Sequence, residues 1–294
     1  MSIGNECVTA GRAGAILLGD CAVNRMGFGA MRFTGKGVWG PPEDRNQALA
    51  TLRRAVELGV NFIDTADSYG PFVSEELIAE ALAPYPDGLV VATKGGWGRV
   101  GPGQWVHNAR PHHLRAAVEG SLKRLRLERI DVYQLHVPDP AVSFDASMET
   151  LAQLRGQGKI RHVGLSNVTL EHLERARRIV PIVSVQNRYS FADREWDYLL
   201  DHCEQNQIAF IPWAPLGQNR KAHEVLDAVS QELGATALQV ALAWLLRRSK
   251  LILPIPGTSS VPHLEENIAA AGVELPQTVY ERLLRVTSPP ASLR

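Results

Sequence analysis

The sequence predicts an α/β fold, a (β/α)8 TIM barrel that forms a single domain over residues 1–294. Short apolar runs rich in β-branched residues alternate with helical patterns, and this unit recurs eight times along the chain. Alternating strands and helices imply a parallel sheet, because each return connection needs a crossover, and eight such units close into a barrel. No low-complexity tract or Pro/Gly-rich linker divides the chain.

The eight strands are expected at 25–31, 60–66, 88–94, 130–136, 160–166, 181–187, 208–215 and 251–257. The helices that follow them are expected at 45–59, 74–83, 111–127, 147–159, 169–179, 194–206, in a longer helical region ending with 236–249, and at 263–271. Gly59 is expected to stop a helix, Ser74 to cap one and Pro111 to occupy a first turn. A hairpin at 14–20 is expected on the barrel floor, and an extra surface helix at 278–286. The turn "GFGAMR" lacks the G-x-G-x-x-G spacing of a Rossmann fold.

Composition and charge argue against several functional classes. Lys plus Arg and Asp plus Glu both number 31, so a dedicated nucleic-acid surface is not expected. Cys7, Cys21 and Cys203 are too few and too widely spaced to indicate a disulfide framework or a zinc site. No signal peptide and no membrane-spanning apolar run is recognisable. We therefore expect a cytoplasmic protein without metal, membrane or nucleic acid as partner, either a monomer or a weak homo-oligomer.

Polar residues follow the predicted strands where each one ends, which is the end at which such barrels hold their sites. These residues are Asp64 with Tyr69 in the next loop, Lys94, His136, Ser166 and Asn167, Gln186 and Asn187, Trp213, and Pro256, Gly257 and Thr258. Each has an ordinary explanation when taken alone: an aspartate caps a turn, a lysine lies along the surface, a histidine or tyrosine packs. Together, the carboxylate, phenol, ammonium and imidazole from three successive strand ends are expected to converge on one mouth.

The chain resembles the aldo-keto reductase family from about residue 22 to residue 286. The resemblance rests on "NFIDTADSYG", "VVATK", "YQLH", "HVGLSN", "VQN", "PWAPLG" and "IPGTSSVPHLEEN", which occur in the order expected of that family. It implies a (β/α)8 barrel that uses a nicotinamide cofactor to reduce aldehydes or ketones. Within the family, "GFGAMRFTGKGVWGPPEDR" and "YGPFVSEELIAEAL" resemble a bacterial branch associated with pyridoxal reductase activity.

The resemblance implies that Tyr69 is the general acid, with Asp64, Lys94 and His136 around it. A free tyrosine, with a pKa near 10, is a reluctant acid, and a lysine cation beside it is expected to lower that pKa. Asp64 is expected to hold Lys94 charged and in place. His136 is expected to donate a hydrogen bond to the substrate oxygen.

The resemblance also implies the cofactor contacts. Ser166, Asn167 and Gln186 would contact the carboxamide, and Trp213 would stack on the nicotinamide ring. Ala214, Leu216 and Gly217 would lie near the pyrophosphate, and Pro256, Gly257 and Thr258 lead into a helix N-terminus that suits a phosphate. Glu266 and Asn267 would hold the adenine. Many relatives carry Lys or Arg near the 2′-phosphate, where this chain has Ser259, Ser260 and His263. Hydroxyls and backbone amides also bind phosphate, so NADPH is favoured over NADH.

Two long loops add aromatic residues that suit a flat substrate or simply pack the loops: Phe33, Trp39, Trp97 and Trp105. Arg99 and Arg110 are candidates for an anionic group, or ordinary solvated arginines. Two other functions stay open: a cofactor-binding regulatory subunit with little turnover, and a barrel isomerase or hydrolase that uses Asp64 and His136 without nicotinamide.

Overall fold

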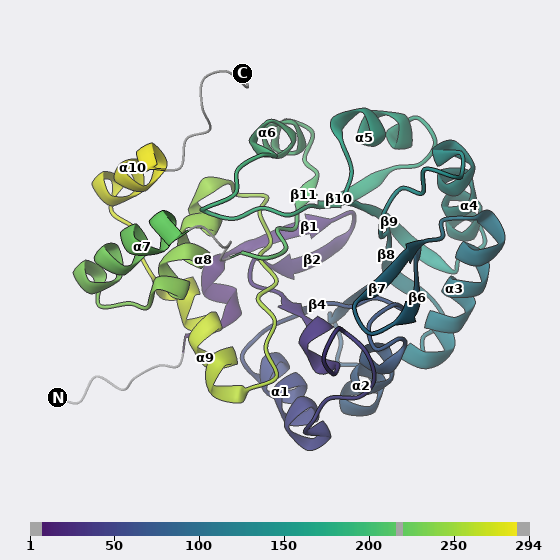
Figure 1. Cartoon of the computed structure of the whole chain (residues 1–294), viewed down its shortest axis with the longest axis horizontal. Helices are drawn as coiled ribbons and strands as arrows, with labels where there is room; N and C mark the ends of the chain where they lie inside the picture. Colours follow the sequence, from purple (N-terminus) through teal and green to yellow (C-terminus); the bar gives the residue numbers. More distant parts are fainter. Residues whose placement is uncertain (1–7, 216–219, 287–294) are drawn as a thin grey trace.

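The computed structural model describes residues 8–215 and 220–286, which form a ring of parallel strands surrounded by helices (Figure 1). Within these residues the ring is a seven-stranded sheet in the order β11-β10-β9-β8-β5-β4-β3. Its strands are β3 (Phe28–Gly29), β4 (Phe62–Asp64), β5 (Val90–Gly95), β8 (Ile130–Leu135), β9 (Ile160–Ser166), β10 (Ile182–Gln186) and β11 (Ala209–Phe210). The predicted α/β barrel is confirmed.

The predicted eighth strand is not a regular strand, although its chain still closes the ring. Phe210 donates its backbone N–H to Leu251 and accepts one from Leu253, both at 2.9 Å, and Gly27 donates to Pro254 at 2.9 Å on the other side. Pro254 and Pro256 have no backbone N–H, so neither can donate a hydrogen bond to a neighbouring strand. The segment therefore bridges β11 and the start of the first strand with isolated bonds.

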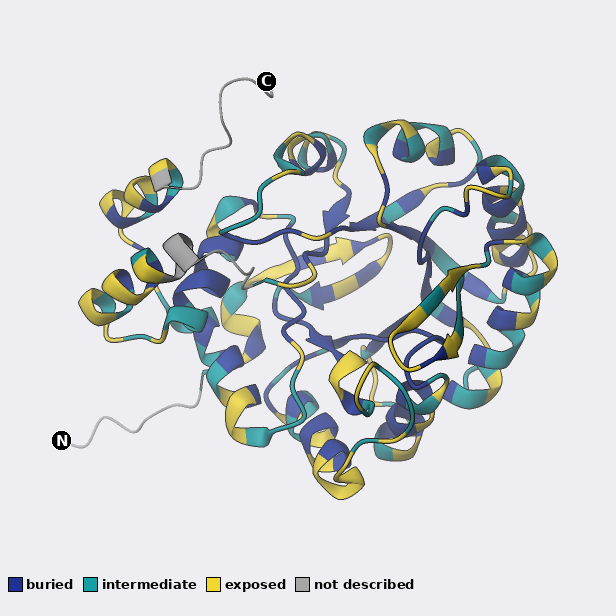
Figure 2. Cartoon of the chain, in the orientation of Figure 1, coloured by how far each residue is buried: buried dark blue, intermediate teal, exposed yellow. Residues whose placement is uncertain are grey.

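Helices cover the outside of the ring between successive strands. They are α1 (Arg45–Glu57), α2 (Val73–Leu82), α3 (Pro111–Leu125), α4 (Phe144–Gly156), α5 (Leu170–Arg177), α6 (Asp197–Gln205), α7 (Arg220–Leu233), α8 (Ala237–Arg248), α9 (Val261–Ala269) and the extra helix α10 (Gln277–Val286), with short 3₁₀ turns η1 (Ala10–Ala13), η2 (Ala30–Phe33) and η3 (Ala270–Gly272). The sides of the helices that face the strands are buried (Figure 2). None of the described helices is long and apolar enough to cross a membrane.

Two of the three local signals placed a helix end correctly. Gly59 follows α1 with φ 82°, and Pro111 opens α3. The prediction that Ser74 caps a helix is wrong: α2 begins one residue earlier, and the buried Ser74 hydroxyl instead donates to the Ala30 carbonyl at 3.0 Å and accepts from Thr65 at 2.8 Å. A buried hydroxyl needs hydrogen-bond partners, and Ser74 finds them in two neighbouring segments rather than at the end of its own helix.

Two hairpins lie at opposite ends of the ring. β1 (Ala15–Leu18) and β2 (Cys21–Asn24) pair antiparallel across the floor, as predicted, and their buried side chains pack against the apolar residues inside the barrel. β6 (Trp97–Gly101) and β7 (Gln104–His107) follow β5 at the other end, where the sequence analysis expected a long loop with aromatic residues. The second hairpin therefore stands beside the carboxyl ends of the strands.

Arg25 ties the end of the floor hairpin to the last turn of α8 and to the closing segment. Its guanidinium donates to the carbonyls of Leu246 at 2.6 Å, Ser249 at 2.5 Å and Ile252 at 3.2 Å. Burial lowers the pKa of Arg25 below its usual value. These carbonyls lie at a helix end and in an irregular segment, so few other donors reach them.

We predict that Arg25→Ala lowers the free energy of unfolding by about 2–4 kcal/mol, because it leaves half-buried carbonyls without donors. Equilibrium unfolding in urea measures the change. The matched control is Arg12→Ala, an exposed arginine of η1, which should shift the value by less than about 0.5 kcal/mol. Equal effects of the two changes would contradict the role given to Arg25.

Candidate active site

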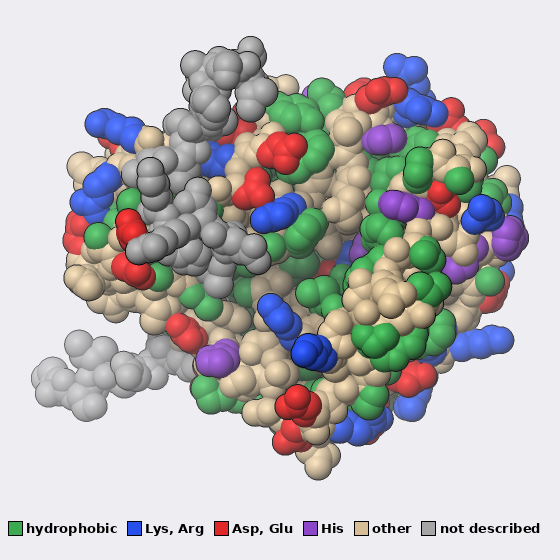
Figure 3. All heavy atoms as spheres, viewed as in Figure 1, with side chains coloured by type: hydrophobic (Ala, Val, Ile, Leu, Met, Phe, Trp, Pro, Cys, Tyr) green, Lys and Arg blue, Asp and Glu red, His purple; other side chains and the backbone are tan. Residues whose placement is uncertain are grey.

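The four predicted catalytic side chains meet at the carboxyl end of the ring. Asp64 ends β4, Lys94 lies in β5, His136 directly follows β8, and Tyr69 is in the loop between β4 and α2. All four are at least nine-tenths buried, and Lys94 is fully enclosed. The face of the molecule that looks into this end is hollowed near its centre (Figure 3).

A buried ion pair forms the base of the site. The Lys94 ammonium donates to Asp64 Oδ1 at 2.5 Å and to the Thr65 carbonyl at 2.8 Å. Asp64 Oδ2 accepts from the amide nitrogens of Gln134 at 3.0 Å and Gln186 at 2.9 Å. Both carboxylate oxygens are thus satisfied, which is the condition under which a buried charge pair is tolerated.

The sequence argument missed Gln134 and gave Gln186 a different neighbour. Gln134 lies two residues before His136 on β8, so the strand period of two places both side chains on the inner face, and that spacing was the available signal. Gln186 was predicted to contact the cofactor carboxamide. Its amide nitrogen is engaged with Asp64, so its cofactor contact stays a prediction.

Lys94 is held in its charged form beside Tyr69. Burial alone lowers the pKa of Lys94, but the carboxylate of Asp64 and the neighbouring Tyr69 outweigh it, and the net pKa lies above 10.5. The ammonium lies 5.2 Å from the centroid of the Tyr69 ring. A positive charge at this position favours any negative charge that forms on the phenol oxygen.

Burial raises the net pKa of Tyr69 above its ordinary value, although the charge and hydrogen bonding of Lys94 lower it, as expected. The charge of Asp64 adds to the rise. In this environment Tyr69 holds its proton firmly at neutral pH.

His136 is a neutral imidazole set edge-on to the tyrosine. Its ring centroid is 5.8 Å from that of Tyr69, with an angle of 81° between the planes. Burial, followed by the charge of Lys94, lowers the pKa of His136 well below 6.5. The Ser68 hydroxyl lies 3.4 Å from Nδ1, a neighbour that the sequence argument did not foresee.

The β6–β7 hairpin sets two indoles beside His136. The ring centroids of Trp97 and Trp105 lie 6.4 and 6.5 Å from the imidazole, and 5.9 Å from each other. Two of the predicted aromatics therefore stand at the mouth. Phe33 does not: it is fully buried and stacks on Phe28 at 5.3 Å in the core.

Arg99 fastens this hairpin to the loops around it. Its guanidinium lies 3.7 Å from the centroid of the Trp105 ring and donates to the carbonyls of Gly37 at 2.7 Å, Val38 at 2.7 Å and Ser68 at 2.8 Å. A guanidinium offers five N–H donors in a rigid fork, and here most of them are engaged with backbone. Arg99 is thus a clamp between loops rather than a free anion ligand.

The residues predicted to hold the nicotinamide lie together on the next part of the rim. Trp213 Nε1 donates to Asn167 Oδ1 at 3.2 Å, and Asn167 Nδ2 donates to Ser166 Oγ at 3.1 Å and to the His136 carbonyl at 3.0 Å. Asn167 and Ala214 both adopt positive φ, near 56° and 54°. Leu216 and Gly217 lie outside the described residues.

The predicted adenosine-binding residues lie in the segment before α9 and along the helix itself. A Cβ at Gly257 would lie 2.3 Å from the Gly29 carbonyl, so only glycine lets this backbone run so close to β3. Asn267 is buried, and its Oδ1 has no partner in the described part of the chain. A buried acceptor without a partner fits a ligand that brings a hydrogen-bond donor, as the predicted adenine would. Pro256 is buried, Thr258, Ser259 and Glu266 are half-buried, and His263 is exposed.

Comparison with known proteins places the chain among oxidoreductases. Residues 25–287 match the profile of the aldo/keto reductase family. The chain is 50% identical over 281 residues to an uncharacterised oxidoreductase of Schizosaccharomyces pombe, covering 95% of this chain and 92% of the relative. It is 46% identical over 273 residues to pyridoxine 4-dehydrogenase of Escherichia coli, covering 90% and 96%. An aldo-keto reductase of Klebsiella pneumoniae, solved in complex with NADPH, matches with a TM-score of 0.78 at 28% identity over 92% of this chain and 93% of that one.

We predict that His136 stays neutral at about pH 6, where an ordinary histidine is mostly protonated. Nitrogen chemical shifts of the imidazole, assigned by comparison with His136→Gln, measure its protonation. In urea the same ring should titrate near 6.5. A native-state titration at or above 6.5 would show that burial does not control this group.

The same shift makes folding stability depend on pH. Below about pH 6.5 the unfolded chain binds a proton at His136 that the native state does not, so this group's stabilisation is present above that pH and is lost as the pH falls. His136→Gln should therefore flatten the decline of unfolding free energy on the acid side.

Proposed function

The chain belongs to the aldo/keto reductase family, and from this premise we propose that it reduces a carbonyl substrate with NADPH, using Tyr69 as the proton donor. The observation that carries the proposal is the enclosed Lys94–Asp64 pair beside a protonated phenol and a neutral imidazole. NADPH, when bound, supplies the hydride that reduces the carbonyl carbon. The protein's own residues supply the proton and the alignment.

Tyr69 transfers its proton only when negative charge forms on the substrate oxygen. A phenol with a raised pKa does not ionise at rest, yet an alkoxide is a far stronger base, comparable with hydroxide, whose conjugate acid has a pKa of about 15.7. The phenolate left behind faces the ammonium of Lys94, which Asp64 keeps charged. The pair thus stabilises the charge-separated state more than the resting state, which is what lowers a barrier.

His136 orients the carbonyl without competing as an acid. A neutral imidazole carries one N–H, and with Nδ1 facing the Ser68 hydroxyl, Nε2 is left to donate to the substrate oxygen. A cationic imidazole at this place would add a second positive charge next to Lys94. The low pKa of His136 therefore keeps Tyr69 as the proton source.

NADPH is the proposed cofactor, with NADH the weaker alternative. Asn167, Ser166 and Trp213 would hold the nicotinamide end, and the backbone around Gly257 and Asn267 would hold the adenosine end. The solved Klebsiella relative contains NADPH. A higher kcat/KM with NADH would overturn this preference.

Pyridoxal, reduced to pyridoxine, is the proposed substrate. Trp97 and Trp105 present ring faces and edges beside His136, and a flat heteroaromatic aldehyde is the shape that such a wall accepts. The 46% identical relative carries the name pyridoxine 4-dehydrogenase. Family membership alone supports only carbonyl reduction, so the substrate is the finer part of the proposal.

We predict that NADPH oxidation, followed by absorbance, occurs with pyridoxal and that Tyr69→Phe lowers kcat/KM by about 10²–10⁴-fold, because only the proton donor is removed. Quenching of tryptophan fluorescence by NADPH should be unchanged in the variant. Binding of NADPH without turnover on any carbonyl compound would instead favour the regulatory-subunit alternative.

We also predict that Arg99→Lys raises KM for pyridoxal about tenfold, because lysine keeps the charge but loses the fork that holds the Trp105 hairpin. Reduction of a small aliphatic aldehyde should change little. Arg110→Lys is the control, since Arg110 is exposed and donates only a long 3.5 Å bond to Asn108. If Arg99→Lys behaves like wild type, Arg99 acts through its charge and the clamp is refuted.

A further inference from the structure

The floor of the barrel holds a group of metal-ligating side chains that the catalytic mechanism does not use. Asp20 and Cys21 lie at the turn and the second strand of the floor hairpin, and His162 lies near the start of β9. Ser166, at the other end of β9, belongs to the predicted cofactor site. The group is therefore at the opposite end of the ring from Tyr69.

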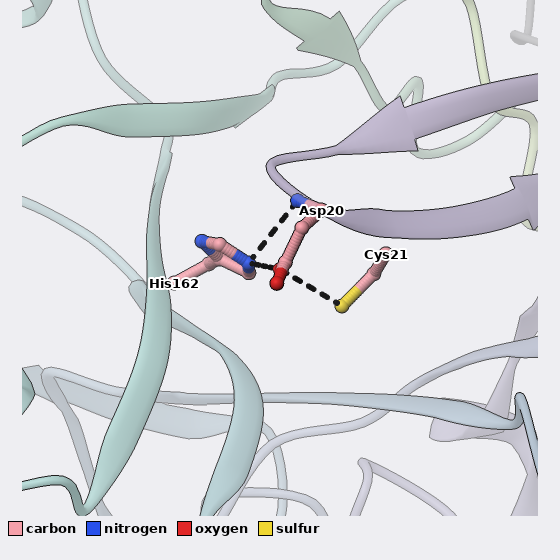
Figure 4. A group of neighbouring side chains, drawn as sticks. All are labelled: Asp20, Cys21 and His162. Carbon is pink, nitrogen blue, oxygen red and sulfur yellow. Dashed lines mark hydrogen bonds and ion pairs between the residues drawn. The ribbon is translucent and has the colours of Figure 1, made fainter.

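The three side chains point toward one another (Figure 4). His162 Nε2 lies 2.5 Å from Asp20 Oδ1, and Cys21 Sγ lies 3.9 Å from the same oxygen. All three candidate ligand atoms fall within 4.8 Å of one another. Ligand atoms around a tetrahedral ion with bonds of about 2.0–2.3 Å are separated by similar distances, so small side-chain movements suffice to admit an ion.

We propose that Asp20, Cys21 and His162 form a binding site for one Zn²⁺ ion, with water from the adjacent depression as the fourth ligand. Imidazole nitrogen, thiolate sulfur and carboxylate oxygen are the ligands that zinc takes in proteins, and three protein ligands plus water is a common set. A hard ion such as Mg²⁺ prefers a full set of oxygen ligands, of which this group supplies only the Asp20 carboxylate.

The carboxylate is already oriented for this role. Arg161 Nη2 donates to Asp20 Oδ2 at 2.7 Å, which leaves Oδ1 facing His162 and Cys21. An outer residue that fixes the free oxygen of a ligating carboxylate is a usual feature of metal sites.

Zinc binding requires the Cys21 thiol to lose its proton, because the thiolate is the form that ligates metals. On binding, the S–H bond is replaced by an S–Zn bond and the proton leaves to solvent. One thiolate and one carboxylate then balance the two charges of Zn²⁺, so the occupied group carries no net charge.

The backbone and the surface nearby leave room for the ring and for entry. A Cβ at Gly19 would lie 2.2 Å from His162 Cε1, and Gly19 has φ +66°, so the turn admits the imidazole only because this residue is glycine. A solvent-open depression of about 400 Å³ is lined by Asp20, His162 and neighbouring arginines. It gives an ion and its water a path to the ligands.

Spacing rules could not find this group. They search for several cysteines and histidines close in sequence, whereas Asp20 and His162 are 142 residues apart and only one cysteine takes part. Folding of the floor hairpin onto β9 brings them together.

The test is a titration of metal-free, full-length protein with Co²⁺, which reports thiolate and geometry by its spectrum. We expect one equivalent to give a thiolate-to-cobalt charge-transfer band and the visible bands of a tetrahedral ion, both displaced by Zn²⁺. Cys21→Ser should abolish the charge-transfer band. Cys203→Ser, which changes the buried cysteine of α6, should keep it.

A second variant keeps the proposal testable if Cys21→Ser folds poorly. His162→Gln retains the thiol, and it should weaken Co²⁺ binding at least tenfold while NADPH still quenches tryptophan fluorescence. Zn²⁺ should raise Tm in wild type and not in His162→Gln, since a ligand that binds only the native state stabilises it. Absence of the charge-transfer band in wild type, or its persistence in Cys21→Ser, overturns the site.

Discussion

The enclosed ion pair of Lys94 and Asp64 is the interaction on which the rest of the site depends. Two charges out of water are costly unless every polar atom around them is satisfied. The parallel register meets this demand: Asp64 lies opposite Ala92 on β5, Lys94 is two residues further on the same face, and Gln134 lies directly opposite Lys94 on β8. Gly164, where a Cβ would lie 3.0 Å from Gln134 Cγ, leaves space for that amide. The register of the barrel strands, rather than any local motif, therefore supplies the partners that allow Lys94 to be buried with its charge.

Burial shifts the pKa values of the two neighbours of the ion pair in opposite directions and leaves both neighbours uncharged. It raises the pKa of Tyr69 and lowers that of His136, so both side chains are uncharged at neutral pH. It also raises the pKa of Asp67 well above its usual value. The ion pair therefore lies beside two side chains that are neutral at rest, and its field acts most strongly on any charge that appears during reaction. The site is arranged to respond to a developing oxyanion rather than to store a phenolate.

The sequence was informative where one residue type answers one local demand. Alternating patterns gave the strands and helices, and the strand-end rule gave Asp64, Tyr69, Lys94 and His136. It failed where several distant segments decide together. Pro254 turned the last strand into a bridge, and Ser74 became a tie to η2 because its hydroxyl is buried. The contacts of Arg99 depend on how the loops at the rim pack together. The contacts of Gln134 depend on which side chains share the inner face of the barrel. The net pKa of Tyr69 could not be read from a neighbouring lysine, because its burial was unknown.

β9 runs from the floor of the ring, where His162 lies, to the mouth, where Ser166 lies. At its carboxyl end β9 runs into Asn167, which adopts positive φ, donates a hydrogen bond to the His136 carbonyl and accepts one from Trp213. At its amino end, His162 is fixed by the floor hairpin. β9 keeps one register against β8 along its length, because most of its side chains are buried. An ion shared by the hairpin and β9 would strengthen the contact between them without touching the reacting groups.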